Sequence, residues 1–396
     1  MIKLKKDIWE KSTLSECCEF HRGVTYSTKD EVDNDGIGIL RANNVNAESS
    51  QLNFDNLRLI RKEARVKESQ KLKKNDVLIC TASGSLDHIG KVAFAKEDTN
   101  YYAGGFMGII RPLEKEIEPN LLFNIFLSER FTTFIQNQRA GTNIQNLKFS
   151  NLESFEIPLP PLEEQKQIAA LFQSIETAME QVDGQEKNLH QLKHKLLRDL
   201  FSEKLEFGNH LKDEDFEKVK FEKIATNISE RVEPKKTELT TYVGLEHLDA
   251  DNLKIERTGT PDDVIGTKLK IYKGDIIFGK RRAYLRKVAV SHFDGIASAH
   301  SMILRANEKN IEKDFLPYFM QSDTFMSRAV QISEGSLSPT IKNKTLAVQE
   351  FILPKKEKQK ELISVLKQFD TTMEQLKQQR TTLKNLKQKL LNEILG

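Results

Sequence analysis

Cysteine and tryptophan are scarce in this sequence of 396 residues, which contains three cysteines and one tryptophan. Cys17 and Cys18 are adjacent, Cys80 is distant from them, and no CxxC spacing occurs. The sequence therefore offers neither a disulfide framework nor a thiolate zinc site. We expect the three cysteines to be buried free thiols in a reducing compartment.

Long apolar runs are also absent, because no stretch approaches the roughly 18 residues that a membrane-spanning helix requires. The basic amino-terminal segment MIKLKKDIWEK lacks the apolar core of a signal peptide. We therefore expect a cytoplasmic protein with no membrane contact. With 38% hydrophobic and 30% charged residues, part of the chain must be long solvated helix or exposed loop. The formal net charge of +3 is too small to indicate a polyanionic partner by itself.

Motifs for catalysis and cofactor binding are missing from the sequence. No GxxxxGK[ST] phosphate loop occurs, and no GxGxxG opens a helix. His190 and His194 lie four residues apart, but the HExxH glutamate and a third ligand are absent, so we interpret them as solvated helix histidines. The sequence predicts no metal, no cofactor and no catalytic residue.

An internal repeat is the strongest feature that the sequence does contain. When the sequence is shifted by 194 residues, 16 of the 43 positions in 159–201 are identical. Apolar residues recur every seven positions in both copies, which indicates a coiled-coil seam along two helices of about 40 residues. The seam positions are Ile168, Ile175, Val182, Leu189 and Leu196 in the first copy and Leu362, Phe369, Leu376, Leu383 and Leu390 in the second.

The two helices can cover each other's apolar stripe. We expect antiparallel pairing within the chain, because a single domain between the helices keeps their local concentration high. Pairing with another chain is the alternative. Prolines before each helix, at Pro160, Pro161 and Pro354, set its start. Asp183-Gly184 predicts a weak point or a local kink in the first helix.

A fainter similarity continues upstream of each helix. The strand-like runs 72–80, 90–95 and 106–112 resemble 271–279, 286–291 and 300–306, and a helical pattern follows each set. We predict two pseudo-repeated globular modules of the α+β or α/β class, separated by two long antiparallel coiled-coil helices. The predicted division is 1–157 (first module), 158–205 (first helix), 206–351 (second module) and 352–396 (second helix).

The loops that join the strands differ between the modules, as expected of two readers of different ligands. In the second module they hold the densest basic cluster, where arginine can grip phosphate or a guanine edge. A solvated hairpin is the alternative. In the first module the matching loop holds short polar side chains, and the RANN segment adds amides suited to adenine. Ordinary turns explain these residues equally well, and helix capping explains those that follow the helical patterns.

The candidate DNA-binding residues of the first module are Arg41, Asn43, Asn44, Thr81, Ser83, Ser85, His88, Lys91, Asn143 and Gln145. Those of the second module are Lys280, Arg281, Arg282, Tyr284, Arg286, Lys287, His300, Ser336, Ser338 and Lys342.

Together these features resemble the specificity subunit of type I restriction-modification enzymes. The resemblance rests on the duplicated organisation, on IPLPPLEEQKQIAALF at 157–172 and on its weaker echo FILPKKEKQKELISVL at 351–366. The segment GDIIFGKRRAYLRKVAV at 274–290 is similar to one class of target recognition domain. The second copy departs from the family pattern at Lys355-Lys356, where the first copy has Pro161-Leu162.

The resemblance implies that each module reads one half of a split target on double-stranded DNA. It also implies that the helix pair sets the spacing and docks two methyltransferase (modification) subunits, with restriction subunits added in the full nuclease. Methylation, ATP hydrolysis and cleavage would then belong to partner chains, and this chain would be noncatalytic. The alternatives are a coiled-coil scaffold whose modules recognise peptides and an enzyme with an unrecognised site.

Overall fold

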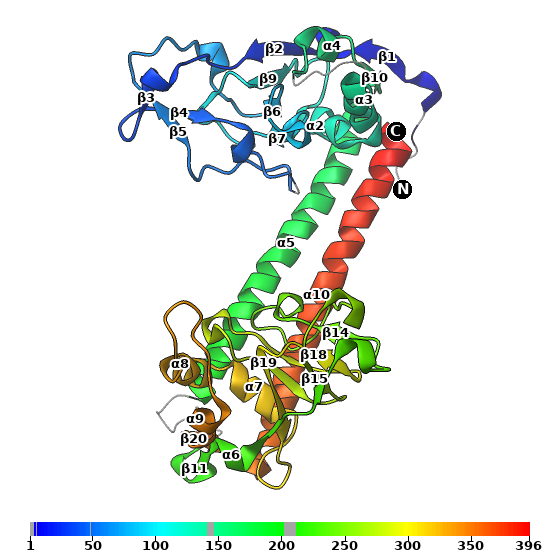
Figure 1. Ribbon diagram of the computed structural model, residues 1–396. Helices are drawn as coiled ribbons and strands as arrows, with labels where there is room; N and C mark the ends of the chain where they lie inside the picture. Colours follow the sequence, from blue (N-terminus) through cyan, green and yellow to red (C-terminus); the bar gives the residue numbers. More distant parts are fainter. Residues whose placement is uncertain (1–3, 5, 48, 141–145, 202–210) are drawn as a thin grey trace. The chain divides into compact units, whose positions relative to one another are not determined.

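The computed structural model describes residues 4, 6–47, 49–140, 146–201 and 211–396 (Figure 1). The chain divides into two compact units: unit 1 is built from Met1–Asp183 and Gln378–Gly396, and unit 2 from Gly184–Lys377. Each unit contains one of the predicted globular modules and a part of both long helices. The units therefore cut across the division into four segments that the sequence suggests.

The first module, in unit 1, contains two four-stranded sheets. The antiparallel sheet β2-β9-β6-β7 is formed by β2 (Cys18–Arg22), β9 (Met107–Pro112), β6 (Val77–Cys80) and β7 (Val92–Phe94). The sheet β3-β5-β4-β8 is formed by β3 (Glu31–Val32), β5 (Arg58–Ile60), β4 (Ile37–Leu40) and β8 (Tyr102–Ala103). Two helices follow β9, namely α2 (Pro119–Leu127) and α3 (Glu129–Ala140). After the short α4 (Phe149–Glu153), β10 (Glu156–Leu159) pairs with β1 (Glu10–Thr13).

The second module, in unit 2, repeats this plan. Its antiparallel sheet β12-β19-β16-β17 is formed by β12 (Ala225–Ile228), β19 (Ser301–Ala306), β16 (Ile276–Gly279) and β17 (Val288–Val290). Its other sheet, β13-β15-β18-β14, is formed by β13 (Arg231–Val232), β15 (Lys268–Ile271), β18 (Gly295–Ala297) and β14 (Tyr242–Val243). The helices α7 (Phe315–Gln321), α8 (Asp323–Gln331) and α9 (Asn343–Ala347) follow β19, and β20 (Glu350–Pro354) pairs with β11 (Phe216–Lys220). The prediction of two pseudo-repeated α+β modules is confirmed.

A buried carboxylate braces the central strands at the same place in both modules. Asp76, fully buried before β6, accepts from the Arg111 guanidinium of β9 at 2.8 and 2.7 Å. In the second module Asp275 precedes β16 and accepts from Arg305 of β19 at 2.8 and 3.1 Å. Bidentate pairing of this kind fixes orientation as well as supplying energy, so it locks the register of neighbouring strands.

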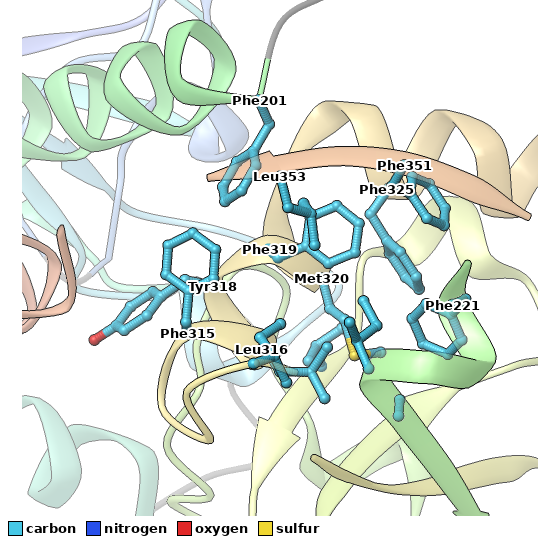
Figure 2. Close-up of a cluster of buried hydrophobic side chains, with 14 of the residues drawn as sticks. Phe201, Phe221, Phe315, Leu316, Tyr318, Phe319, Met320, Phe325, Phe351 and Leu353 are labelled. Atoms are coloured by element: carbon cyan, nitrogen blue, oxygen red, sulfur yellow. The ribbon is translucent and has the colours of Figure 1, made fainter. Parts of the chain in front are cut away.

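The hydrophobic core of unit 2 is rich in phenylalanine and includes residues of both long helices. Phe315 and Phe319 of α7 pack with Phe325 of α8 and Phe351 of β20 (Figure 2). The long helices contribute Leu197 and Leu200 of α5 (Leu162–Leu200) and Ile363 and Leu366 of α10 (Lys356–Leu395). This core therefore holds the end of one long helix and the beginning of the other.

The core of unit 1 uses the opposite helix ends. It includes residues from the beginning of α5 and from the end of α10, namely Ile168, Ala169, Phe172, Leu391, Ile394 and Leu395. A long helix with an apolar stripe is stable in water only when that stripe is packed. Each module thus covers one end of each helix.

Ion pairs show that the helix segments within each unit run antiparallel. In unit 1, Lys387 Nζ lies 2.6 Å from Glu176 Oε1, and Arg380 Nε lies 2.6 Å from Asp183 Oδ1. As the residue number increases along α5, the number of its partner on α10 decreases. This confirms the predicted antiparallel pairing within the chain. The helix α5 is continuous through Gly184, so the predicted interruption there does not occur.

Unit 2 contains the repeat-related counterpart of the first ion pair. Lys193 Nζ lies 2.6 Å from Asp370 Oδ1, and these residues are 194 positions from Lys387 and Glu176 respectively. Tyr318 donates to the other Asp370 oxygen at 2.6 Å, and burial followed by the Asp370 carboxylate raises the pKa of its phenol. Because a buried charge needs its one partner, the pair of Lys193 and Asp370 favours one register of the two helices over shifted registers.

Burial along the helices departs from a uniform heptad. Of the ten seam positions, Ile168, Ile175, Val182 and Leu376 are buried, while the other six (Leu189, Leu196, Leu362, Phe369, Leu383 and Leu390) are half-buried. Buried residues just off the seam are Phe172, Leu197, Leu366 and Leu391. A straight α-helix drifts by about 20° per heptad, and the helix ends turn toward the module cores rather than toward each other.

A buried glutamine ties the first turn of each long helix to its module. Gln165 accepts from the Glu118 amide at 2.8 Å and donates to the Glu116 and Pro160 carbonyls at 3.1 and 2.9 Å. Gln359 likewise accepts from the Glu312 amide at 2.8 Å and donates to the Pro354 carbonyl at 2.8 Å. Because each amide satisfies backbone groups on both sides of the junction, it fixes how the helix leaves the module.

Replacing Gln165 by alanine is expected to destabilise unit 1. The change leaves the Glu118 amide and two carbonyls without this partner, at a cost of about 1–3 kcal/mol. Thermal unfolding should shift downward by about 2–4 °C for each kcal/mol lost. Gln167, exposed on the same turn, provides the matched control Gln167→Ala. Equal midpoints for the two variants would contradict the role of Gln165.

Candidate nucleic-acid interface

Three loops of the second module meet at one edge of its antiparallel sheet. They are the basic loop (residues 280–287) after β16, the turn 298–300 before β19, and the tip hairpin (residues 334–340) after α8. The Ile341 amide donates to the Lys280 carbonyl at 3.0 Å, and the Arg282 amide donates to the Pro339 carbonyl at 2.8 Å. The basic loop and the tip hairpin are therefore joined by backbone hydrogen bonds that do not depend on side-chain type.

The tip hairpin is closed by two hydrogen bonds between Glu334 and Thr340, at 2.9 and 3.1 Å. Gly335 adopts a φ of 105°, which favours glycine. At the tip, Ser336 is exposed and Leu337 is 91% exposed. Lys342 forms an ion pair with Glu334, which lowers the pKa of that carboxyl group.

Arg281 is the centre of this edge. Its guanidinium donates to Ser338 Oγ at 3.0 Å and lies 3.4 Å from His300 Nε2. Burial first, and the Arg281 cation second, lower the pKa of His300, which favours a neutral imidazole that accepts from Arg281. Three of the predicted residues, from three separate segments, are thus brought together. Arg282 and Tyr284, in the same basic loop, are exposed.

Two predicted DNA contacts in the basic loop, Arg286 and Lys287, are bonded within the module. The Arg286 side chain is 23% exposed and donates to Asp251 at 2.8 Å, to Asp323 at 2.9 Å and to the Gln321 carbonyl at 2.6 Å. The Lys287 ammonium donates to the Leu245 carbonyl. Arg286 thus uses three of its donors and Lys287 one within the module, so both side chains brace the loop. Lys280 is half-buried, and this burial lowers the pKa of its ammonium.

The first module forms the same edge with different side chains. Cys80 is paired with Met107 as Gly279 is paired with Ser301. Ala82 is bridged to Asn146 as Arg281 is bridged to Thr340. The Leu147 amide donates to the Thr81 carbonyl at 2.6 Å, as Ile341 donates to Lys280.

By this register, Ala82 occupies the position of Arg281, and Phe106 occupies that of His300. The predicted residues Asn143 and Gln145 lie outside the described residues.

Further predicted readers in the first module prove to be structural. Asn44 is fully buried; its amide accepts from the Arg41 backbone and donates to the Asn53 and Asp55 carbonyls at 3.0 and 3.2 Å. Thr81 is buried and donates to the Phe106 carbonyl at 3.0 Å. Both side chains are buried and hydrogen-bonded within the module, so neither is exposed to a base, and both predictions are corrected.

The remaining candidates of the first module lie at or near its surface. Asn43 and Ser85 are exposed, whereas Ser83 accepts from the Ser85 amide at 3.1 Å. His88 Nδ1 lies 3.1 Å from Lys91 Nζ. Arg41 is half-buried, and its buried Nε has no hydrogen-bond partner in the part of the chain that the structure describes.

Sequence reasoning missed two exposed apolar side chains at these edges, Phe106 in the first module and Leu337 in the second. The repeat alignment pairs the FMGIIRP and HSMILRA segments. It therefore places Phe106 at the position of His300 and could have identified this residue. A lone aromatic residue at the start of an apolar run is otherwise typical of a buried strand.

A family model described as the type I restriction modification DNA specificity domain matches the chain twice, over residues 6–191 and 214–385. The chain belongs to this family. Both matches include a module and most of the long helix that follows it, which agrees with the repeat of the structure.

Curated relatives of this specificity family match parts of the chain. The type I restriction enzyme StySPI specificity subunit of Salmonella potsdam is 33% identical over 193 residues, and the EcoKI specificity subunit of Escherichia coli is 32% identical over 193 residues. Each match covers 48% of this chain and 40% of the relative, so the chain matches about two fifths of their length. The MjaVIII specificity subunit of Methanocaldococcus jannaschii is 24% identical over 69% of this chain and 68% of its own length.

Solved structures share the fold of this specificity-family chain. The S subunit of a type I restriction-modification system from M. genitalium is 15% identical, with a TM-score of 0.57 over 100% of this chain and 98% of that one. A chain from a study of the assembly and conformational transition of a type I R-M system is 16% identical, with a TM-score of 0.60 over 97% and 96%. Among the residues that the structure describes, no helix is both long and apolar enough to cross a membrane.

In this specificity-family chain, two neighbouring arginines are expected to behave differently when changed to alanine. Arg286→Ala removes the brace between the basic loop and two carboxylates, which should cost about 2 kcal/mol of stability and lower the thermal midpoint. Arg282→Ala, at an exposed position, should leave the midpoint unchanged. If both variants unfolded at the wild-type temperature, Arg286 would not be a brace.

Proposed function

We propose that the chain is the noncatalytic DNA-specificity subunit of a type I restriction-modification complex in the cytoplasm. Each module contacts one half of a bipartite target on double-stranded DNA. The helix pair fixes the gap between the half-sites and docks two methyltransferase subunits, and restriction subunits join in the full nuclease. Chemistry on DNA then belongs to the partner subunits.

The observation that carries this proposal is the pair of matching loop edges. Both are held by the same backbone hydrogen bonds, yet one presents Arg281, His300 and Ser338, and the other presents Ala82 and Phe106. A shared scaffold with different exposed side chains is what two readers of different sequences require. Exposed arginine can bind a phosphate or the O6 and N7 atoms of guanine. Membership of the DNA specificity family supports the same function.

DNA affinity of the complex with its methyltransferase subunits is expected to fall steeply as salt rises, because cationic contacts release counterions from phosphates. Arg281→Ala should weaken binding: a uniform loss with a salt slope lower by about one indicates a phosphate contact, whereas relaxed preference at one base indicates readout. The control is Lys309→Ala, an exposed cation beyond the far end of β19. Absence of DNA binding at low salt would overturn the proposed function.

Exchanging residues 206–350 for the corresponding module of a relative should change one half of the target and leave the other half intact. Each module makes its own loop edge from its own residues, so specificity should move with it. Mapping methylated positions in DNA from cells that carry the hybrid chain and its partners reads both halves and the gap. A change in both halves would contradict the assignment of one half-site to each module.

A further inference from the structure

Phe106 is the most exposed large apolar side chain among the described residues of unit 1, with 71% of its surface accessible. It lies in the short turn between β8 and β9, directly before the fully buried strand residue Met107. Placing an aromatic ring in water at this turn contributes nothing to the core. Single exposed apolar residues are common on protein surfaces, so exposure alone does not give the ring a role.

The backbone that carries the ring is held unusually firmly for an exposed turn. The Phe106 carbonyl accepts three hydrogen bonds, from the Thr81 amide at 2.9 Å, the Ala82 amide at 3.1 Å and the Thr81 hydroxyl at 3.0 Å. The next amide, of Met107, donates to the Gly104 carbonyl at 2.7 Å. A ring presented on a fixed backbone loses little conformational entropy when it meets a partner.

The position of Phe106 is that of His300 in the second module, where the imidazole lies beside Arg281 and the Arg281 guanidinium bonds Ser338. In the first module Ala82 replaces Arg281, so no guanidinium can contact a phosphate or a guanine from this point. Short polar residues lie beside Ala82 in the described part of this edge: Ser83 and Ser85 follow it in the sequence, and Asn146 is bridged to it. The first module therefore meets its ligand here with an apolar surface set among short polar groups.

The apolar surfaces that a DNA duplex offers are the thymine methyl groups in the major groove and the faces of bases where a step is opened. We propose that Phe106 is the apolar base contact of the first module and that its ring lies against a base of the first half-site. This inference rests on the proposed DNA-specificity function. It assigns to the first module a base contact that differs in kind from the Arg281 contact of the second.

The test uses the complete complex with its methyltransferase subunits and DNA that carries its mapped target. Phe106→Ala should weaken binding to this target by roughly tenfold to a hundredfold, the range of a lost aromatic or base-edge contact. The salt slope should not change, because an apolar contact releases no counterions. Preference within the second half-site should also be unchanged. Phe106→Leu should retain part of the affinity.

Leu113→Ala is the matched control, because Leu113 is an apolar residue, 37% exposed, just beyond the other end of β9. The complex with Leu113→Ala should bind DNA with the affinity of the wild-type complex. The ring of Phe106 is largely in solvent, so the thermal midpoint of Phe106→Ala should also stay at the wild-type value. A lowered midpoint together with weakened binding would mean that the ring supports the fold, and it would overturn the proposal.

Two DNA modifications distinguish the source of the contact. If the ring meets a thymine methyl, replacing that thymine by deoxyuridine should weaken wild-type binding and leave Phe106→Ala binding unaffected. If the ring meets an opened step, 2-aminopurine at that step should brighten on binding of the wild type but not of Phe106→Ala. Either result supports the proposal.

Specific binding by Phe106→Ala within twofold of the wild type would overturn the proposal for Phe106 and leave the proposed function standing. Relaxed preference in the second half-site would also overturn it. Failure of the wild-type complex to bind DNA at low salt would instead overturn the proposed function.

Discussion

The burial of helix ends in the two module cores is the constraint on which the rest of the structure depends. Neither long helix has a face that its partner helix covers from end to end, since most seam positions are only half-buried. The missing burial comes from the modules: Phe172 and Leu391 enter one core, and Leu197 and Leu366 enter the other. Unit 1 is therefore complete only when residues at both extremes of the sequence have come together. Contacts of such long sequence separation are formed at a high entropic cost, and the apolar stripe of the helices offsets it.

The glutamine at each helix entry turns this packing into a fixed geometry. Apolar burial is nondirectional, so Phe172 or Leu366 alone would tolerate some rotation of the helix. Gln165 and Gln359 each accept from one module amide and donate to a carbonyl at the helix entry, and these bonds have narrow angular limits. The buried Lys193 and the half-buried Lys387, each with one carboxylate partner, favour one register of the two helices. Specific polar contacts thus set the geometry that the apolar contacts stabilise.

Sequence patterns predicted the architecture well and the candidate site unevenly. The two helices follow from heptad periodicity and the main strands from short strand-like runs, which are local patterns, and the 194-residue repeat follows from comparing the sequence with itself. The role of an individual polar residue is not local. Arg281 and Arg286 are five positions apart in one basic loop, yet their side chains have different partners. Arg281 lies at the loop edge and donates to Ser338. Arg286 is held by Asp251 and Asp323, which come from other segments. The RANN pattern predicted that Asn44 contacts adenine. In the structure its amide donates to two backbone carbonyls. Phe106 was overlooked because an aromatic residue before an apolar run usually enters the core.

The same division shows how a chain of net charge +3 is compatible with the polyanionic ligand that we propose. Many cations are paired internally, as Arg286, Lys193 and Lys387 are, so the formal sum says little about any one surface. What matters for binding is the charge that remains at the loop edges, and there the modules differ: Arg281 and Arg282 stand at one, Ala82 and Phe106 at the other. Because backbone hydrogen bonds hold both edges, side chains there can change without loss of position. Under the proposed function, the cost of altering specificity is then confined to the exchanged side chains, and one chain combines the arginine contact proposed for the second module with the apolar contact proposed for the first.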